Sequence, residues 1–340
     1  MYVFYLFFIV AVVAFKLYFG NEMKRKSDTV KEIDLSERVV IITGANAGLG
    51  KEIALRLARR GAHIIMACRT ESKANQAIQE LIKATGNTKI EFMQLDLLSL
   101  DSVVSFAAAF RQRSLPCHIL VNNAGIMWLT EDSVNQPPLT TQPDNSVFNT
   151  QFLANYIGHL LLTLSLFDIL MKSSSSILNV SSSVHNLSSL NLDNLTGNHS
   201  QTFITYCQSK LCQIYNTYEL QRRIDQYSAD HPEEPKCVVN AVHPGIFASE
   251  IVSLPWPLKG LYHTVFKSAA YCSEYIVECL VSQQLQGIGG RYFDHGRQTK
   301  SSRASYDTAV SSQLFQRTIE LISTRLPSNC NPLSPSGSWL

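Results

Sequence analysis

Charged residues are scarce in this chain of 340 residues, since Asp, Glu, Lys and Arg make up 16% of it and hydrophobic residues 45%. A chain of that composition does not stay a solvated coil, which excludes disorder for its bulk. Neither sign of charge dominates, because 29 Lys and Arg stand against 27 Asp and Glu, with no dense basic stripe. We therefore expect a large core and no nucleic-acid partner. The length fits either two domains or one large α/β domain.

Paired cysteines are also missing. The eight cysteines lie far apart along the chain, and none belongs to a Cys-x-x-Cys pair. This spread argues against a zinc site and against a disulfide scaffold. We predict no metal site, and free, mostly buried thiols in a reducing compartment.

Charge is absent from the first segment, Met1 to Phe15, and three basic residues follow at Lys24–Lys26. As a helix, residues 2–20 would span about 28 Å, close to the hydrocarbon thickness of a bilayer. We interpret residues 1–20 as a single-pass membrane anchor. A cleaved signal peptide, which would make the protein secreted, is the alternative, but it would carry its positive charge before the apolar run.

The side of the membrane follows from the same basic cluster. The positive-inside rule places Lys24–Lys26 and the chain behind them in the cytosol, with the endoplasmic reticulum as the expected membrane. Sequons at Asn186, Asn194 and Asn198 point the other way, because a lumenal domain could be glycosylated there.

Behind a linker at residues 21–36, apolar runs rich in β-branched residues alternate with amphipathic patterns up to residue 325. Strands are predicted at Val39–Ile42, His63–Ala67, Ile90–Gln94, Ile119–Asn122, Ile177–Val180, Cys237–Ala241 and Gly290–Phe293. Helices are predicted at 49–60, 71–84, 99–113, 147–171, 205–226 and 268–283. This alternation is typical of a Rossmann-type, doubly wound α/β domain with a parallel sheet of about seven strands. Thr130–Asn145 and Val184–Thr205 are predicted loops, and residues 326–340 a mobile tail.

A glycine-rich turn follows the first predicted strand. It reads Thr43-Gly44-Ala45-Asn46-Ala47-Gly48-Leu49-Gly50 and opens into a helical pattern. Glycines let the backbone approach a pyrophosphate closely, and the helix offers it unpaired N–H groups and its positive dipole end. A simple tight turn is the alternative, but the place in a βαβ unit favours dinucleotide binding.

The residues that select between NAD and NADP are expected at the end of the second predicted strand. An NAD-selective site carries an acidic residue there, whereas this chain has Ala67-Cys68-Arg69-Thr70. A guanidinium at Arg69 suits a 2′-phosphate, so we predict NADP(H) rather than NAD, although Arg69 could also be a solvated charge at a helix start. Asp96, after the third strand, could contact the adenine or act as the N-cap of the helix at 99–113.

Tyr206 and Lys210 form a Tyr-x-x-x-Lys pattern on a predicted helix. Residues four apart share one helix face, so the phenol and the ammonium are expected side by side. A neighbouring ammonium, together with an oxidised nicotinamide, would lower the pKa of the phenol toward neutrality and make it a useful acid and base. The pattern is short enough to arise by chance, so the catalytic interpretation depends on where Tyr206 and Lys210 lie relative to the other motifs.

The sequence resembles the short-chain dehydrogenase/reductase family along residues 36–300. The matching elements, in chain order, are Thr43-Gly44-x-x-x-Gly48-x-Gly50, Asn122-Asn123-Ala124-Gly125, Asn155, a serine run around Ser182, Tyr206-x-x-x-Lys210 and Pro244-Gly245. The phrases Asn155–Thr163, Ala67–Thr70, Ser209–Cys212 and Val242–Gly245 are similar to the retinol-dehydrogenase branch and its WW-domain relatives, with the predicted anchor here in place of WW domains.

The resemblance implies a role for each catalytic position. Tyr206 would be the general acid/base, and Lys210 would lower its pKa and bind the nicotinamide ribose. Ser182 would hold the substrate oxygen, with Ser181 and Ser183 left open as alternatives. Asn155 would place a water that relays protons from Lys210.

Further positions are implied around the cofactor. Asn123, Ala124 and Gly125 would line its cleft, and Pro244 and Gly245 would border the nicotinamide, although turn chemistry alone explains both stretches. With a phenol available as base, His185 and His243 are interpreted as structural. Tyr206 follows Ser182 by 24 positions, and the stretch between them includes a polar insertion, which bears on the shape of the pocket.

The segment Ile251–Phe266 is strongly apolar and is interpreted as a lid over the substrate, or else as a loop packed on its own core. Beside an anchor, such a lid suits a lipophilic alcohol or its carbonyl, and the resemblance implies a retinoid. An isoprenoid alcohol or a steroid fits equally. A dinucleotide-binding scaffold with little turnover is the alternative function. A sugar-nucleotide epimerase is disfavoured by the glycine spacing, and the resemblance allows a homodimer.

Overall fold

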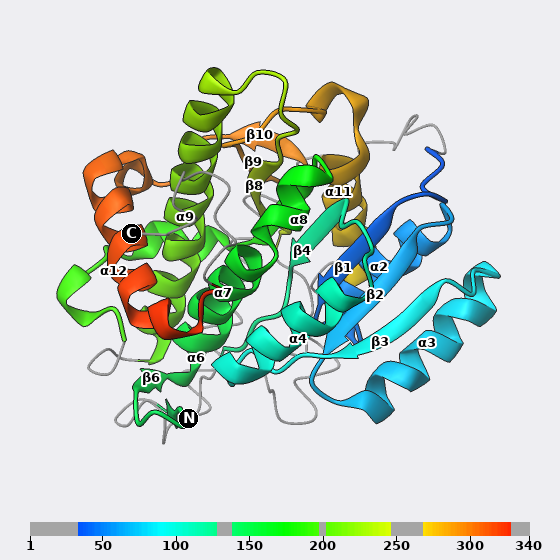
Figure 1. Cartoon of the computed structure of the whole chain (residues 1–340), viewed down its shortest axis with the longest axis horizontal. Coiled ribbons are helices and arrows are strands. Elements are labelled where there is room, and N and C mark those ends of the chain that lie inside the picture. The colour runs from blue at the N-terminus through cyan, green and yellow to red at the C-terminus, as the bar shows by residue number, and fades with distance from the viewer. Residues whose placement is uncertain (1–32, 128–137, 197–201, 246–267, 328–340) are drawn as a thin grey trace, which may run out of the picture.

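The structure, a computed structural model, describes residues 33–127, 138–196, 202–245 and 268–327 (Figure 1). The predicted anchor at residues 1–20 and the apolar segment at residues 251–266 lie outside this part of the chain. Among the described residues, no helix combines the length and the apolar character needed to cross a bilayer.

An eight-stranded sheet runs through the molecule in the order β10-β9-β8-β7-β4-β1-β2-β3. Its strands are β1 (Val39–Thr43), β2 (His63–Cys68), β3 (Ile90–Gln94), β4 (Ile119–Asn122), β7 (Ser176–Val180), β8 (Val238–His243), β9 (Tyr292–Asp294) and β10 (Arg297–Thr299). All pairings are parallel except that of β9 with β10. The predicted doubly wound α/β fold is confirmed, and each of the seven predicted strands is present.

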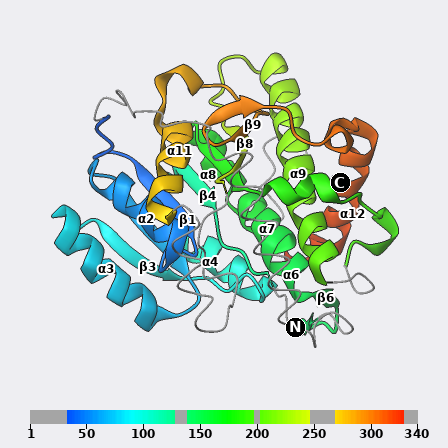
Figure 2. The same ribbon diagram turned by 180° about the vertical axis from the view of Figure 1, so that it is seen from behind.

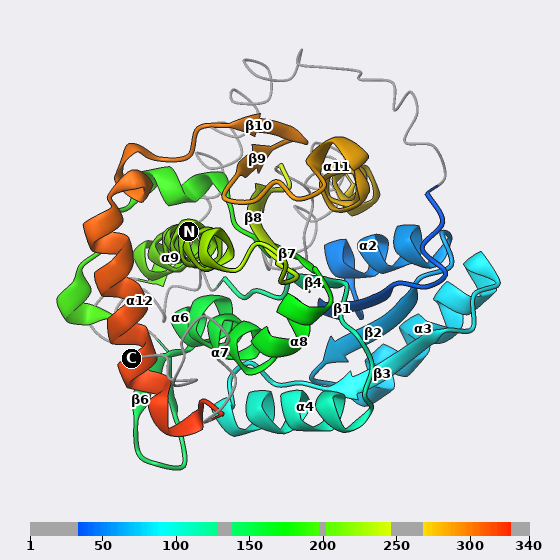
Figure 3. The same ribbon diagram turned by 45° about the horizontal axis from the view of Figure 1, so that its top comes forward.

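Helices cover both faces of the sheet (Figures 2 and 3). One face carries α2 (Gly48–Ala58), α3 (Glu71–Thr85) and α11 (Ala269–Val281), and the other carries α4 (Leu100–Gln112), α7 (Gly158–Ser165), α8 (Phe167–Lys172), α9 (Thr202–Asp230) and α12 (Thr308–Ile322). Strand β1 shows why both faces are covered. Val40 and Ile42 pack into the core on the α2 face, while Val39 and Ile41 pack into the core on the α4 face. A strand that is apolar on both faces requires helices on both.

The eighth strand, β10, is one more than the predicted number of about seven. It pairs with β9 through a two-residue hairpin, His295–Gly296, in which both residues have positive φ angles of 49° and 76°. All three residues of β10 are exposed, so no apolar alternation marks the strand in the sequence.

A second correction concerns the described residues 138–171, predicted as the last part of a loop, Thr130–Asn145, followed by one helix at 147–171. A hairpin of β5 (Leu139–Thr141) and β6 (Val147–Asn149) lies there instead. The Asn149 side chain accepts hydrogen bonds from the backbone N–H groups of Gln151 and Phe152. This cap makes the helix begin at Thr150, as α6 (Thr150–Phe152), rather than at residue 147.

Other predicted boundaries also change. Helix α9 is longer than the predicted 205–226, and the loop predicted at Val184–Thr205 contains two short 3₁₀ turns, Ser183–Leu187 and Leu192–Asn194. Helix α12 was not predicted at all. It packs its apolar face beside α9, so its core contacts come from distant parts of the chain. Of the predicted tail, residues 328–340 lie outside the described residues.

Candidate active site

The chemistry-bearing residues of the sequence gather at one edge of the sheet. Strands β1, β4, β7 and β8 are neighbours and parallel, so their carboxyl ends meet there. The segments that follow them are Gly44–Gly50, Asn123–Gly125, Ser181–Ser183 and Pro244–Gly245. Ligands of doubly wound sheets bind at this edge, outside the carboxyl ends of the strands.

The glycine turn after β1 presents an open helix end. Gly44 and Gly48 have φ angles of 66° and 54°, which favour glycine. At Gly50, an added Cβ would lie 2.6 Å from the Gly44 carbonyl oxygen, whereas at Gly48 it would meet nothing within 4 Å. Helix α2 begins at Gly48 with no side-chain cap and no acidic residue in its first turn. Its N–H groups are therefore available to an anion such as a pyrophosphate.

Neighbouring segments hold this turn in place. The Thr43 hydroxyl accepts hydrogen bonds from the backbone N–H groups of Asn123 and Ala124, both at 2.9 Å. The Asn123 side chain returns a bond to the Thr43 carbonyl at 2.9 Å. On the other side, the backbone N–H groups of Ala45 and Asn46 bond to the buried Cys68 sulfur, and burial raises the pKa of this thiol to about 11. Leu49 points into the core, which leaves only its backbone for a ligand.

The end of β2 carries Arg69 on the surface. Its backbone carbonyl accepts a hydrogen bond from Gln94, and within the described part of the chain its guanidinium forms no ion pair. Asp96, at the end of β3, accepts a hydrogen bond from the Leu98 N–H at 3.0 Å. The N-cap of α4 is Ser99, so the alternative interpretation of Asp96 as this cap is wrong.

Tyr206 and Lys210 lie on the buried side of α9, and the Lys210 Nζ is 5.7 Å from the centre of the Tyr206 ring. The ammonium donates to the Val180 carbonyl at 2.8 Å and to Gln213 Oε1 at 3.2 Å. Burial lowers the pKa of Lys210 to about 7. Burial raises the pKa of Tyr206, and a hydrogen bond with Ser182 opposes that rise.

Two of the three serines after β7, Ser181 and Ser182, have different environments. The Ser181 hydroxyl is buried and donates to the Lys210 carbonyl at 2.8 Å, which ties β7 to α9. The Ser182 hydroxyl pairs with Tyr206. Of these two, only Ser182 therefore has its side chain at the phenol.

Asn155 lies in a π-helical turn, Leu153–Ile157, between α6 and α7. Its side chain is fully buried and bonds both backbone groups of Ile126, accepting from the N–H at 2.8 Å and donating to the carbonyl at 3.0 Å. Gly125 lies between Asn155 and Lys210, because a Cβ there would be 3.4 Å from Asn155 Oδ1 and 3.6 Å from Lys210 Nζ. Single π turns occur frequently at functional sites.

Pro244 and Gly245 follow β8. Gly245 has a φ of 90°, and a Cβ there would approach His295 Nε2 to 2.6 Å, so this position requires glycine. His243 is buried, which lowers its pKa to about 4. His185 bonds the Ser182 carbonyl through Nδ1 at 2.6 Å and accepts from the Ser302 N–H through Nε2 at 3.0 Å. Because both ring nitrogens of His185 are engaged in hydrogen bonds to the backbone, the contacts agree with a structural role for this residue.

Two residues of the site were not predicted from sequence. His159, on α7, accepts from the Thr43 hydroxyl at 2.9 Å and donates to the Asn155 carbonyl at 3.2 Å, and burial lowers its pKa to about 3. Gln213, on α9, bonds both Lys210 and the Asn155 carbonyl. The available signal was spacing, since Gln213 follows Lys210 by three residues and His159 follows Asn155 by four, one helical turn in each case.

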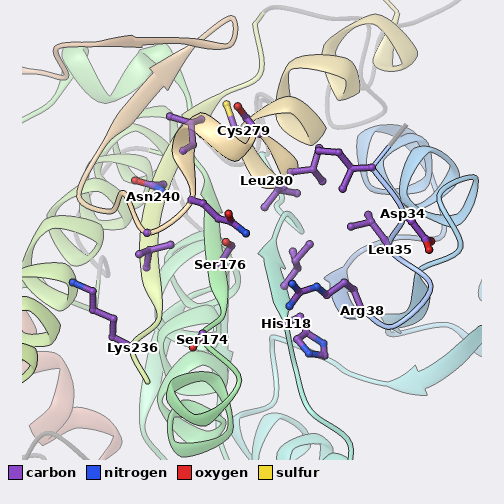
Figure 4. A pocket seen from close by; sticks show the side chains of 18 residues that line it. Asp34, Leu35, Arg38, His118, Ser174, Ser176, Lys236, Asn240, Cys279 and Leu280 are labelled. Atoms are coloured by element: carbon purple, nitrogen blue, oxygen red, sulfur yellow. The ribbon is translucent and has the colours of Figure 1, made fainter. Parts of the chain in front are cut away.

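A cavity of about 290 Å³ lies at the opposite, amino edge of the sheet (Figure 4). Its lining includes Arg38, His118, Ser176 and Lys236, which stand at or just before the starts of β1, β4, β7 and β8. None of the predicted site residues lines it.

Two further predictions concern metal ligands and cysteines. Among the described residues, no group of three His, Cys, Asp or Glu side chains is arranged to hold a metal ion. Seven of the eight cysteines fall within these residues, and all seven are free and buried.

Comparison with known proteins places this site in a family context. The family model described as short chain dehydrogenase matches residues 38–254. The chain is 31% identical over 296 residues to polyprenol dehydrogenase of Homo sapiens, with 84% of this chain and 85% of that protein covered. It is 33% identical over 307 residues to retinol dehydrogenase 13 of Homo sapiens, with 86% of each covered. The WW domain-containing oxidoreductase of Gallus gallus is 35% identical over 280 residues, with 77% of this chain and 62% of that protein covered.

A solved structure supports the same fold. An uncharacterised protein from Mycobacterium paratuberculosis superposes with a TM-score of 0.68 at 28% identity, covering 87% of this chain and 97% of that one.

Proposed function

The chain belongs to the short-chain dehydrogenase family, and we propose that it is an NADP(H)-dependent oxidoreductase that interconverts a lipophilic alcohol and its aldehyde or ketone. The observation that carries this proposal is the grouping of Ser182, Tyr206 and Lys210 beside the glycine turn. A hydroxyl, a phenol and an ammonium at that edge match the needs of proton transfer to a carbonyl oxygen.

The cofactor would lie along the carboxyl edge of the sheet. The uncapped start of α2, with Gly44, Gly48 and Gly50, suits the pyrophosphate. Arg69, exposed and without an ion pair among the described residues, would face the 2′-phosphate. The remaining proposed contacts are Asn46, Leu49, Asp96, Asn123, Ala124, Gly125, Pro244 and Gly245. When bound, the cofactor supplies or accepts the hydride.

The chain's own residues would handle the proton. In reduction, the Ser182 hydroxyl and the Tyr206 phenol hold the substrate oxygen, and Tyr206 gives it a proton. Burial raises the pKa of this phenol in the structure, and the lowering expected from the sequence would need the positive charge of an oxidised nicotinamide beside that of Lys210. The Lys210 ammonium then stabilises the phenolate, as it would when Tyr206 acts as base in the reverse direction.

The proposed substrate is a retinoid, with an isoprenoid alcohol or a steroid as alternatives. Two relatives carry the names retinol dehydrogenase and polyprenol dehydrogenase, which describe lipophilic alcohols. The apolar composition of Ile251–Phe266 after Pro244-Gly245 suits such a substrate.

We also propose that residues 1–20 anchor the protein in the endoplasmic reticulum membrane, with the catalytic domain at residues 37–325 on the cytosolic side. The uncharged run and the basic residues Lys24–Lys26 support this arrangement.

The test is to follow NADPH absorbance with all-trans-retinal, using the full-length protein in detergent. We expect the wild type to oxidise NADPH and the Tyr206→Phe variant to be slower by about a hundredfold or more, because the proton donor is lost. Tyr227→Phe is the matched control, since it removes a hydroxyl from the exposed end of the same helix, where Tyr227 bonds Glu234. Tight NADPH binding without turnover of retinal, isoprenoid or steroid carbonyls would instead support a scaffold.

A further inference from the structure

The buried Lys210 ammonium is hydrogen-bonded by two uncharged oxygen atoms. Its Nζ donates to the Val180 carbonyl and to Gln213 Oε1, and no carboxylate forms an ion pair with it among the described residues. The titratable groups that face it are Tyr206 on its own helix, His159 from α7 and His243 from β8. Burial keeps all three neutral near pH 7, since it lowers the pKa of His159 to about 3 and of His243 to about 4 and raises that of Tyr206. Each of the two oxygen acceptors is therefore important for keeping a buried ammonium charged.

The orientation of the Gln213 amide is fixed by its two partners. Its Nε2 donates to the Asn155 carbonyl at 2.8 Å, while its Oε1 accepts from Lys210 at 3.2 Å. The flipped amide would place an NH₂ group against the ammonium and an oxygen against the carbonyl, which loses both bonds. Gln213 is itself 3% exposed, so water offers it no substitute partners.

The Asn155 end of this link is itself fixed. Its backbone carbonyl accepts from Gln213 Nε2 and from His159 Nδ1. Its side-chain amide bonds both backbone groups of Ile126 and the Ser209 hydroxyl. Gln213 therefore connects Lys210 to a buried residue that cannot move without breaking these bonds.

We propose that Gln213 is a positioning residue of the active site: its amide joins Lys210 to Asn155 directly and keeps the Lys210 side chain charged beside Tyr206. The catalytic role of Gln213 rests on the proposed function, whereas the effect of Gln213 on the charge of Lys210 does not.

The experiment measures the titration of Lys210 directly. Full-length protein carrying ¹³C at lysine Cε is titrated by NMR, and Lys210→Met identifies the resonance. Gln213→Leu should lower the titration midpoint by about one pH unit, the tenfold change in proton affinity expected when one hydrogen bond to a charged group is lost. Gln213→Glu should raise the midpoint, because a carboxylate then faces the ammonium. The matched control is Gln221→Leu, which removes another buried amide of α9, one that accepts from the Val239 N–H.

Unchanged midpoints in Gln213→Leu and Gln213→Glu would overturn the proposal, as would an equal shift in Gln221→Leu. If Gln213→Leu does not fold, the direction of the shift in Gln213→Glu decides. In the NADPH assay, the pH profile of turnover should shift in the same direction as the midpoint. Absence of turnover in the wild type would count against the proposed function alone, because the titration needs no substrate.

Discussion

At the scale of single residues, neutral hydrogen-bonding groups rather than ion pairs hold the candidate site together. Thr43 joins the glycine turn to Asn123 and Ala124 and also bonds His159, which in turn bonds the Asn155 carbonyl. Buried polar groups that are fully paired specify a single arrangement, whereas an unpaired one is costly. This network therefore sets the position of the site more strictly than apolar packing alone would.

Arg69 gives a prediction about cofactor choice. Arg69→Ala should weaken NADPH binding by about tenfold, because a charge-assisted contact to the 2′-phosphate is lost, and leave NADH binding within about twofold. Fluorescence titration of both cofactors measures this. Arg59→Ala removes another exposed arginine, just beyond the end of α2, and should change neither affinity. Equal weakening of NADPH and NADH would refute the role assigned to Arg69.

At the scale of elements, the π turn Leu153–Ile157 positions the Asn155 backbone carbonyl in the site. In it, the Gly158 N–H bonds the Leu153 carbonyl, five residues back, instead of the carbonyl four residues back. The insertion of one extra residue per turn widens the helix and changes which way neighbouring groups point. Asn155 lies within this turn, and its carbonyl bonds side chains from α7 and α9.

At Gly158, where α7 begins, helix propensity and steric fit predict opposite effects of a substitution by alanine. It has an ordinary helical φ of −61°, so propensity alone makes Gly158→Ala stabilising by about 1 kcal/mol. An added Cβ would, however, lie 2.8 Å from the Leu97 backbone carbonyl. We expect a net loss of about 1–3 kcal/mol in unfolding free energy, measured by urea denaturation.

Gly287→Ala is the control for this substitution, since its Cβ would meet nothing within 4 Å and only its positive φ of 72° opposes the change. Its cost should be about 1 kcal/mol, smaller than that of Gly158→Ala. A Gly158→Ala protein more stable than the wild type would show that α7 can move away from Leu97.

At the scale of the whole molecule, the two edges of the sheet differ in chemistry. The carboxyl edge carries the glycine turn and the Ser182–Tyr206–Lys210 grouping, while the amino edge carries the cavity next to Ile33 and Leu35. The described chain thus begins at the amino edge, across the sheet from the candidate active site.

The side of the membrane can be tested through the sequons. Asn186 lies on the surface in a 3₁₀ turn, so a lumenal domain would present it to the glycosylation machinery. We expect the full-length protein, synthesised with microsomes, to show no endoglycosidase-sensitive mobility shift. A version led into the lumen by a cleavable signal peptide is the positive control and should shift. A shift in the unmodified protein, reduced by Asn186→Gln, would place the domain in the lumen.

The sequence by itself determined the seven parallel strands of the sheet and the helices between them, and it indicated which residues follow these strands at the carboxyl edge. Continuous apolar strands such as Val39–Thr43 bury both faces, and a glycine turn after a strand is a local pattern, so both can be read without long-range contacts. The spacing of Tyr206 and Lys210 predicted their closeness for the same reason, since a helical turn is local.

Only the tertiary structure decided the features that depend on contacts between distant segments. The exposed strand β10 is positioned by its pairing with β9, and helix α12 by its packing against α9. No local sequence pattern indicates either contact. The partners of Gln213 were equally hidden, because one lies 58 residues away on another helix. A buried amide reveals its role only once the fold shows which donor and which acceptor flank it.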